Sequence, residues 1–242
     1  MIELKNLTRK FGGFTAVDRL NLMVPRGEIF GFIGPNGAGK TTTIKMIGGL
    51  IAPTQGDVVI AGFNMARDPV AAKQRIGFIP DRPFLYEKLT GMEFLRFIAD
   101  LYGVPEDEFH VRAETHLQMF ALLDWADELI ESYSHGMKQR LIMAAALLHD
   151  PDLIVVDEPL VGLDPEGIKM VRELFRELAA AGKTIFMSTH TLKIAEDICH
   201  RIGIIHRGRL IAGGTVDELR QTAGNETGDL EEVFLRLTRA PH

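Results

Sequence analysis

Eight residues, Gly34 to Thr41, form the most specific chemical pattern in the chain. They read Gly-Pro-Asn-Gly-Ala-Gly-Lys-Thr and lie between an apolar run over 28–33 and a helical pattern over 42–47, the context of a phosphate-binding loop. Glycine permits the tight curl that turns backbone N–H groups toward phosphate oxygens at the positive end of the next helix. Lys40 would reach the β- and γ-phosphates, and the Thr41 hydroxyl would bind Mg²⁺. The pattern predicts ATP or GTP binding, because an ordinary glycine-rich turn does not need Lys-Thr at the helix start.

Two predicted strands end in polar residues that could act on this nucleotide. The apolar run over 153–156 is followed by Asp157 and Glu158, and the run over 184–187 leads to His190. Ligands of open parallel sheets gather at the carboxyl ends of the strands. We expect Asp157 to hold Mg²⁺, directly or through its water, and Glu158 to accept a proton from the attacking water, although two acids could merely cap a strand. His190 could bind the γ-phosphate, but a lone histidine is more often structural.

Two single residues could also touch the nucleotide or its metal. Asp81 follows a short predicted strand at 75–80 and could contact the metal shell. Phe11 lies on a predicted turn, where its ring could stack on a base or could equally pack in the core.

The elements that must position these residues predict an α/β fold. Alternating residues over 2–7 and 14–24 predict two antiparallel strands, and strands and helices alternate from 153 to 205, which favours a parallel sheet covered by helices. The segment 84–149 shows helical spacing, at 91–102, 105–123 and 136–148, with little strand signal. We therefore expect a β and parallel-sheet core over 1–83 and 150–223, an all-helical insertion over 84–149 and a helical tail over 224–242.

Composition excludes several classes of protein. The chain has 242 residues, of which 46% are hydrophobic, so it can bury a sizeable core. A net charge of −6 argues against a surface built to hold nucleic acid. A single cysteine rules out an internal disulfide and suits a reducing compartment. The longest strongly apolar stretch, 141–148, is far shorter than the ~20 residues that cross a bilayer, so we expect no direct membrane insertion.

The octapeptide from Tyr133 to Arg140, Tyr-Ser-His-Gly-Met-Lys-Gln-Arg, lies shortly before the strand that ends at Asp157. This octapeptide resembles the signature sequence of the nucleotide-binding subunits of ATP-binding cassette (ABC) transporters. Together with the phosphate loop, the two acids and His190, it makes the chain resemble such a subunit over nearly its whole length. It implies one ABC ATPase domain over 1–242 with the RecA-like P-loop NTPase fold. In that family two ATP molecules are sandwiched in a head-to-tail dimer, and the signature helix of each subunit points at the γ-phosphate held by the other.

The resemblance implies a role for each motif. Phe11 would stack on adenine, Glu158 would be the general base, and His190 would be the switch histidine. Ser134, the Gly136 amide and a helix N-terminus would supply donors to the partner's γ-phosphate in place of an arginine finger.

The remaining implied residues bind nucleotide, metal or both. Lys40 would also be catalytic, Mg²⁺ would be held by Thr41, Asp157 and Asp81, and Asp164 would belong to the loop Gly162-Leu163-Asp164 that signals across the dimer. The expected nucleotide-binding set is Phe11, Gly34, Pro35, Asn36, Gly37, Ala38, Gly39, Lys40, Thr41, Thr42, Ser134, Gly136 and Asp164.

Three residues depart from the family pattern. Asp81 stands where most of the family has glutamine, which adds a negative charge near Mg²⁺, while His135 replaces a glycine and Met137 a glutamine in the signature. The pattern Tyr-Ser-x-Gly-Met-x-Gln-Arg, together with the tail at 229–238, looks like the branch that exports drugs, polysaccharide or lipid-linked molecules.

The resemblance implies an ATPase that drives transport through a separate transmembrane permease subunit. It would bind ATP and Mg²⁺ as a homodimer, or as a heterodimer with a related cassette, on the cytoplasmic face of the membrane and without nucleic acid. The alternative is a soluble ABC ATPase in DNA repair, ribosome function or cofactor assembly, although such relatives usually bring coiled coils, zinc modules or two cassettes. A phosphotransferase would leave the segment 133–140 unexplained.

Overall fold

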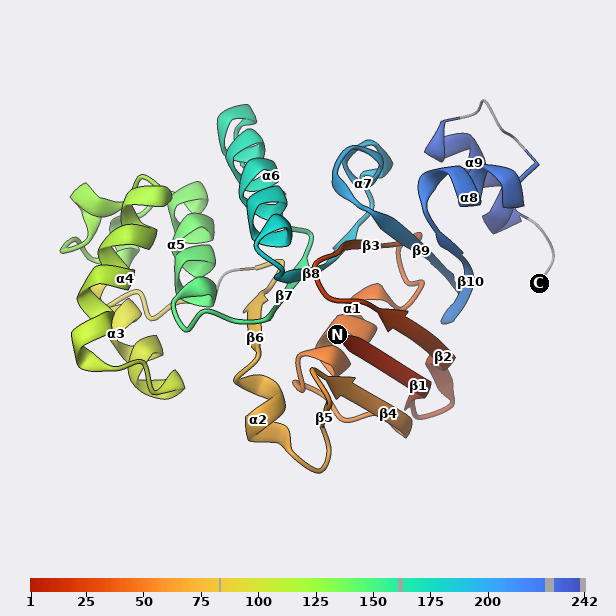
Figure 1. Cartoon of the computed structure of the whole chain (residues 1–242), viewed down its shortest axis with the longest axis horizontal. Helices are drawn as coiled ribbons and strands as arrows, with labels where there is room; N and C mark the ends of the chain where they lie inside the picture. The colour runs from red at the N-terminus through yellow and green to blue at the C-terminus, as the bar shows by residue number, and fades with distance from the viewer. Residues whose placement is uncertain (83, 161–162, 225–228, 240–242) are drawn as a thin grey trace.

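Two β-sheets form the centre of the chain in a computed structural model that describes residues 1–82, 84–160, 163–224 and 229–239 (Figure 1). The first sheet is antiparallel, with the order β2-β1-β4-β5. Its strands are β1 (Ile2–Phe11), β2 (Phe14–Val24), β4 (Gln55–Ile60) and β5 (Phe63–Asn64). The predicted N-terminal hairpin is present, and its register pairs Phe11 with Phe14 across a turn of two glycines.

The second sheet has six strands in the order β10-β9-β3-β8-β7-β6. The five strands from β9 to β6 run parallel, and β10 pairs antiparallel with β9. Side chains of β7 alternate between two cores: Ile154 and Val156 join the core shared with the helical insertion, whereas Leu153 and Val155 join the core shared with the antiparallel sheet. Burial on both faces explains why these strands read as continuous apolar runs. The strand bounds are β3 (Ile29–Ile33), β6 (Ile76–Ile79), β7 (Leu153–Asp157), β8 (Thr184–Thr189), β9 (Arg201–His206) and β10 (Arg209–Gly214).

Helices that follow the strands cover this sheet. In α6 (Pro165–Ala180) the apolar stripe contains buried Val171, Leu174 and Phe175, so this face of the helix packs in the core. The other core helices are α1 (Lys40–Ile47), α2 (Pro69–Lys73), α7 (Leu192–Ile198), α8 (Val216–Thr222) and α9 (Leu230–Arg239).

The helices α3 (Gly91–Tyr102), α4 (Glu106–Met119) and α5 (His135–Leu147) form one group, at the left of Figure 1 and away from the antiparallel sheet. They lie within the predicted insertion, and two short 3-10 turns, Leu123–Trp125 and Ile130–Ser132, connect α4 to α5. The helix expected over 105–123 ends at Met119 instead, because the backbone turns at Ala121, where φ is 53°.

Several short elements lacked a sequence signal. The strand β5 has two residues, α2 has five, and β10 is an edge strand that ends in two glycines. The lengths of β5 and α2 are too short for periodicity to reveal, and the two glycines of β10 weaken its strand signal. Of the predicted helical tail over 224–242, residues 225–228 and 240–242 lie outside the described residues.

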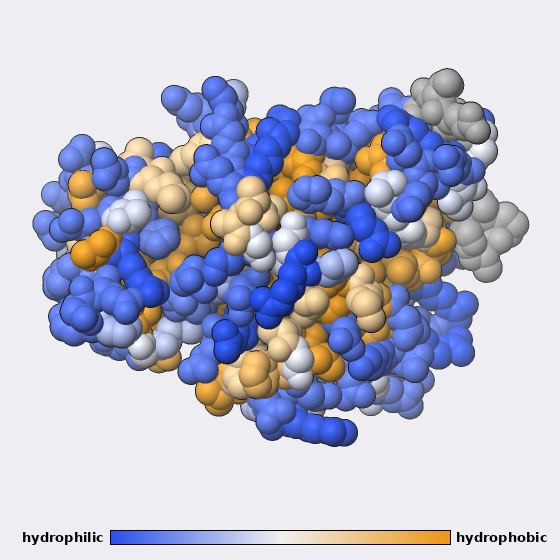
Figure 2. Space-filling view, in the orientation of Figure 1, coloured by the Kyte–Doolittle hydropathy of each residue, from blue (hydrophilic) through white to orange (hydrophobic). Residues whose placement is uncertain are grey.

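On the face shown in Figure 2, hydrophilic side chains cover most of the rim, whereas apolar patches lie over the middle and on the helical group. Within the described ranges, no helix combines the length and the apolar character needed to cross a bilayer.

Candidate functional site

The phosphate loop lies between β3 and α1, where two glycines are required by close packing. At Gly39 φ is +109°, and a Cβ there would lie 2.5 Å from the carbonyl oxygen of Ala16. A Cβ at Gly34 would collide with the carbonyl oxygen of Ile205. Only glycine meets both demands, since L side chains rarely adopt such a φ and have no room here.

Lys40 begins α1 and folds back over the loop. Its Nζ donates hydrogen bonds to the carbonyl oxygens of Gly34, at 2.7 Å, and Pro35, at 3.3 Å. Burial lowers the pKa of Lys40, and the negative charges of Glu158 and Asp157 oppose that shift. The two acids therefore lie within electrostatic reach of the lysine, as the sequence predicts. Phosphate oxygens could take the place of the two carbonyls as acceptors.

Asp157 ends β7 and is held by the neighbouring strand. Asp157 as a whole is 5% exposed, and its Oδ1 accepts a hydrogen bond of 2.5 Å from the Ser188 hydroxyl. The register places Asp157 directly beside Ser188 in the parallel pair β7–β8. The sequence analysis missed this partner, although its position at the end of the predicted run over 184–187 was the available signal.

Glu158 is fixed by its backbone and by His190. Its φ is +53°, a left-handed conformation that is unfavourable for a residue with a Cβ, and its N–H donates to the Ser188 carbonyl oxygen at 3.2 Å. Nδ1 of His190 lies 2.9 Å from Oε1 of Glu158. The proposed base and the proposed switch histidine are thus in direct contact, although they are 32 positions apart in the chain (190 − 158).

One cavity of about 520 Å³ brings most of the predicted residues together. Hydroxyl, ammonium, carboxylate and imidazole groups line it beside two exposed aromatic rings, a set that suits a nucleotide with a charged phosphate end and a flat base. Its lining consists of Phe11, Phe14, Ala16, Asn36, Gly37, Gly39, Lys40, Thr41, Thr42, Asp81, Glu158 and His190.

Phe14 is a lining residue that the sequence analysis missed. It is 63% exposed, and Phe11, at 48%, carries the guanidinium of Arg9 4.6 Å from its ring centre. The signal was the alternation of β2, which pairs Phe14 with Phe11 across the hairpin. Two aromatic rings, and not one, are therefore available in this cavity to stack on a nucleotide base.

Three predicted residues lie outside the cavity at the starts of two helices, and Gly34, Pro35, Ala38 and Asp157 do not line it either. The Ser134 hydroxyl accepts a hydrogen bond from the Met137 N–H at 3.2 Å, and Gly136 lies in the first turn of α5. Asp164 caps α6 by accepting from the Gly167 N–H at 2.9 Å. Neither cap lines the cavity that contains Lys40, so a single chain does not assemble the whole predicted site. Gly162 lies outside the described residues.

The predicted metal ligands offer oxygen atoms only. Thr41 contributes a hydroxyl and Asp157 a carboxylate with Oδ1 bonded to Ser188, and Mg²⁺ prefers such hard oxygen donors together with phosphate oxygens. In the part of the chain that is described, no three His, Cys, Asp or Glu side chains form a metal-binding group. The donor set therefore fits a Mg²⁺ bound jointly with a nucleotide, and Asp81 reaches the same cavity as an exposed carboxylate.

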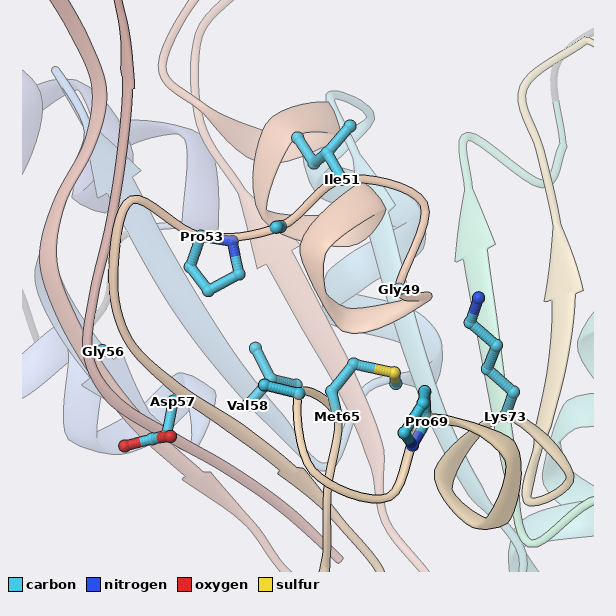
Figure 3. A pocket seen from close by; sticks show the side chains of 11 residues that line it. Gly49, Ile51, Pro53, Gly56, Asp57, Val58, Met65, Pro69 and Lys73 are labelled. Atoms are coloured by element: carbon cyan, nitrogen blue, oxygen red, sulfur yellow. The ribbon is translucent and has the colours of Figure 1, made fainter.

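A second, smaller hollow of about 140 Å³ has a different character (Figure 3). Apolar groups such as Val58, Met65 and Pro69 dominate its wall, and Figure 3 shows Asp57 and Lys73 on opposite sides of it. It lacks the phosphate loop, Glu158 and His190 that line the larger cavity, so its lining does not resemble the phosphate end of that cavity.

Comparison with known sequences agrees with this geometry. The family described as ABC transporter matches residues 17–161. The linearmycin resistance ATP-binding protein LnrL of Bacillus subtilis is 38% identical over 99% of this chain and 79% of its own length. The bacitracin transport ATP-binding protein BcrA of Enterococcus faecalis is 40% identical over 91% of this chain and 71% of its own length.

Solved structures extend the match to the whole fold. An ATP-binding subunit of an ABC transporter superimposes with a TM-score of 0.94 at 38% identity, covering 99% of this chain and 100% of that one. The ATP-binding cassette MJ0796, in a dimeric post-hydrolysis state bound to ADP and Pi, gives a TM-score of 0.81 at 28% identity over 89% of this chain and 98% of that one. The expected α/β cassette fold is confirmed, and the chain belongs to the ABC transporter family as an ATP-binding subunit that hydrolyses ATP.

Proposed function

We propose that two copies of this chain, or one copy and a related cassette, close around two ATP molecules and drive export through a separate permease subunit. Each cavity holds one nucleotide, with the base against Phe11 and Phe14 and the phosphates at Lys40. The partner copy completes the site with Ser134 and the N-terminus of α5. The observation that supports this most directly is the split between the cavity, which contains Lys40, Glu158 and His190, and the two helix caps outside it.

In the hydrolytic step, several residues of one chain each have a separate role. Lys40 attracts the β- and γ-phosphates, and Glu158 accepts a proton from the water that attacks the γ-phosphorus as the bond to the leaving ADP oxygen breaks. His190 holds the Glu158 carboxylate by its 2.9 Å contact and is placed to respond when the γ-phosphate leaves. Mg²⁺, held by Thr41 and Asp157, would neutralise charge on the β- and γ-phosphate oxygens. Asp81 would add a further carboxylate beside it.

The N-terminus of α5 would act from the partner copy. Ser134 is exposed, and its hydroxyl satisfies one of the first N–H groups of the helix, while Gly136 leaves open space where a side chain would stand. A helix N-terminus attracts anions because its free N–H groups and its dipole are both positive. The γ-phosphate of an ATP bound to the other copy is such an anion. Asp164 at the start of α6 would lie near the same junction.

An exposed aromatic cluster supports a permease as the further partner. Phe84 is 80% exposed and Tyr86 50%, and Tyr86 meets both Phe84 and Phe97 edge to face, with ring centres 6.3 and 5.4 Å apart. Exposed aromatic clusters are typical of protein contact sites. This one follows Asp81 closely in the chain, so a permease segment bound here could sense the nucleotide cavity. The printed functions of LnrL and BcrA, linearmycin resistance and bacitracin transport, support a drug or antibiotic as the cargo.

The decisive test mixes two damaged chains. Lys40→Ala removes the phosphate ligand and Ser134→Ala removes the partner's donor, and each variant alone should lose most of its ATPase activity. In a mixed dimer the intact Lys40 of one chain faces the intact Ser134 of the other. A 1:1 mixture should therefore recover roughly a quarter of the parent activity if the copies exchange freely.

The matched control mixes Lys40→Ala with Glu158→Gln. Both changes fall in the same cavity, so no mixed dimer contains a complete site and no recovery is expected. Failure of the first mixture to exceed this control, with mixed dimers shown to form by tagged pull-down, would contradict the shared site.

A further inference from the structure

Ser188 contacts both acids at the end of β7 through different atoms. Its hydroxyl donates to Oδ1 of Asp157 at 2.5 Å, and its backbone carbonyl accepts from the Glu158 N–H at 3.2 Å. Ser188 is fully buried, at 0% exposure, so water does not compete for its hydroxyl. The side-chain bond is thus a strong bond between a hydroxyl and a carboxylate in a water-poor setting.

The parallel register explains why this contact is specific. Asp157 and Ser188 are direct neighbours on β7 and β8, so their side chains emerge on the same face of the sheet. Two positions further along β8 and its extension, His190 reaches Glu158 in the same way. Each acid therefore has its own partner, on β8 or directly after it, and neither partner can replace the other.

We propose that Ser188 is a positioning residue that fixes the Asp157 carboxylate for Mg²⁺, an inference that rests on the proposed magnesium role of Asp157. The bond occupies Oδ1 and leaves Oδ2 as the oxygen available to the metal or its water. A carboxylate with a second hydrogen-bonding partner loses less rotamer freedom when it binds a metal, because its orientation is already set. Ser188 itself touches neither nucleotide nor metal in this scheme.

The test measures nucleotide binding and does not depend on turnover. The affinity for a slowly hydrolysed ATP analogue is determined once with excess EDTA and once with Mg²⁺, and the ratio of the two affinities gives the magnesium enhancement. Ser188→Ala should lower this enhancement roughly 10-fold, since loss of a residue that orients a metal ligand typically lowers metal affinity 10- to 100-fold. Its affinity in EDTA should stay within about twofold of the parent value.

Three further variants separate positioning from general damage. Thr184→Val removes another fully buried hydroxyl from the other end of β8, where it accepts from the Gly27 N–H at 3.1 Å, and should leave the magnesium enhancement unchanged. Ser188→Thr keeps the hydroxyl and should retain most of the enhancement. In an Asp157→Asn background, Ser188→Ala should cause no further loss of enhancement, because the carboxylate that it orients is gone.

Two results would overturn the inference. One is a Ser188→Ala variant with the parent's magnesium enhancement, and the other is an affinity that falls equally with and without Mg²⁺. The underlying magnesium assignment fails separately: Asp157→Asn would then keep the full enhancement, which would remove the proposed role of Asp157 and this inference together.

Discussion

The edge of the parallel sheet and the N-terminus of α5 supply the two halves of the proposed site, and they are built differently. At the sheet edge, side chains from two distant segments hold one another, in the contacts Ser188–Asp157 and His190–Glu158. At α5, Ser134 bonds within the described residues only to its own helix, and Ser134 and His135 face solvent. The first half therefore depends on long-range packing within one chain. The second is a local motif that, in the proposed dimer, would act on the nucleotide bound to the other copy.

The largest expected effect is at the sheet edge. Glu158→Gln keeps the size of the side chain and removes its basicity, so ATP turnover should fall by about 10²- to 10⁴-fold, the usual contribution of a general base. Affinity for ATP should change little, because Lys40 and the loop remain. Steady-state phosphate release and equilibrium nucleotide binding measure the two quantities. Unchanged turnover would remove Glu158 from its role.

The contact between the helical group and the parallel sheet should make the stability of the protein depend on pH. The ring of His149, which follows α5, stacks on Tyr102 at the end of α3 with ring centres 3.7 Å apart, and its Nε2 lies 3.1 Å from the Ile76 carbonyl oxygen of β6. Burial, together with nearby Arg112 and Lys183, lowers the pKa of His149 to about 4, although the Ile76 carbonyl and Asp150 oppose this shift. The neutral ring therefore links the helical group to the sheet.

The direction of the stability change follows from the unfolded chain, in which the pKa of histidine is near 6.5. Between about pH 6.5 and 4 the unfolded state binds a proton that the folded state does not, so stability should fall as the pH decreases through this range. We expect a loss on the order of 2 kcal/mol, reduced for partial exposure of the ring. Denaturant unfolding at several pH values measures it. A His149→Gln variant with the same slope would show that another group is responsible.

A smaller effect is expected from the exposed aromatic rings that line the nucleotide cavity. Phe11→Ala removes one of the two rings available to the base and should weaken ATP binding about 10-fold, since stacking of a base on an aromatic ring is worth ~1–3 kcal/mol. Met23→Ala is a matched control, because Met23 is also an exposed residue of the antiparallel sheet but does not line the cavity. Equal losses in the two variants would argue against base stacking.

The smallest expected effect comes from removing the N-cap of a helix in the helical group, with the N-cap of α8 as a comparison. Thr90 caps α3 in a capping box with Glu93, and Thr215 caps α8 in the same way with Glu218. Thr90→Ala should lower stability by about 1 kcal/mol and leave ATP affinity unchanged. Hydrogen exchange should report the loss in α3 for this variant and in α8 for Thr215→Ala. A change in ATP affinity for Thr90→Ala would show that the two regions are coupled more tightly than their contacts indicate.

Much of the fold could be predicted from the sequence because the strands and helices carry long, regular patterns. The apolar runs before Asp157 and His190, the stripe of α6 and the change to helical spacing after Phe84 all reflect burial that repeats along the chain. Short elements such as β5 and α2 have no such repeat. The partner of Asp157 was missed for a different reason, since the strand-end position of Ser188 is visible in the sequence but the pairing of β7 with β8 is not.

The sequence by itself determined which groups are available: a glycine loop with Lys40 and Thr41, two acids at one strand end, and a capped helix beginning after Ser134. These are local patterns, fixed by neighbours in the chain. Only the tertiary structure decided which groups meet, because the order β3-β8-β7 brings segments more than a hundred residues apart to one sheet edge and leaves Ser134 outside it. Contact between strands depends on sheet order and register, which no stretch of sequence contains alone.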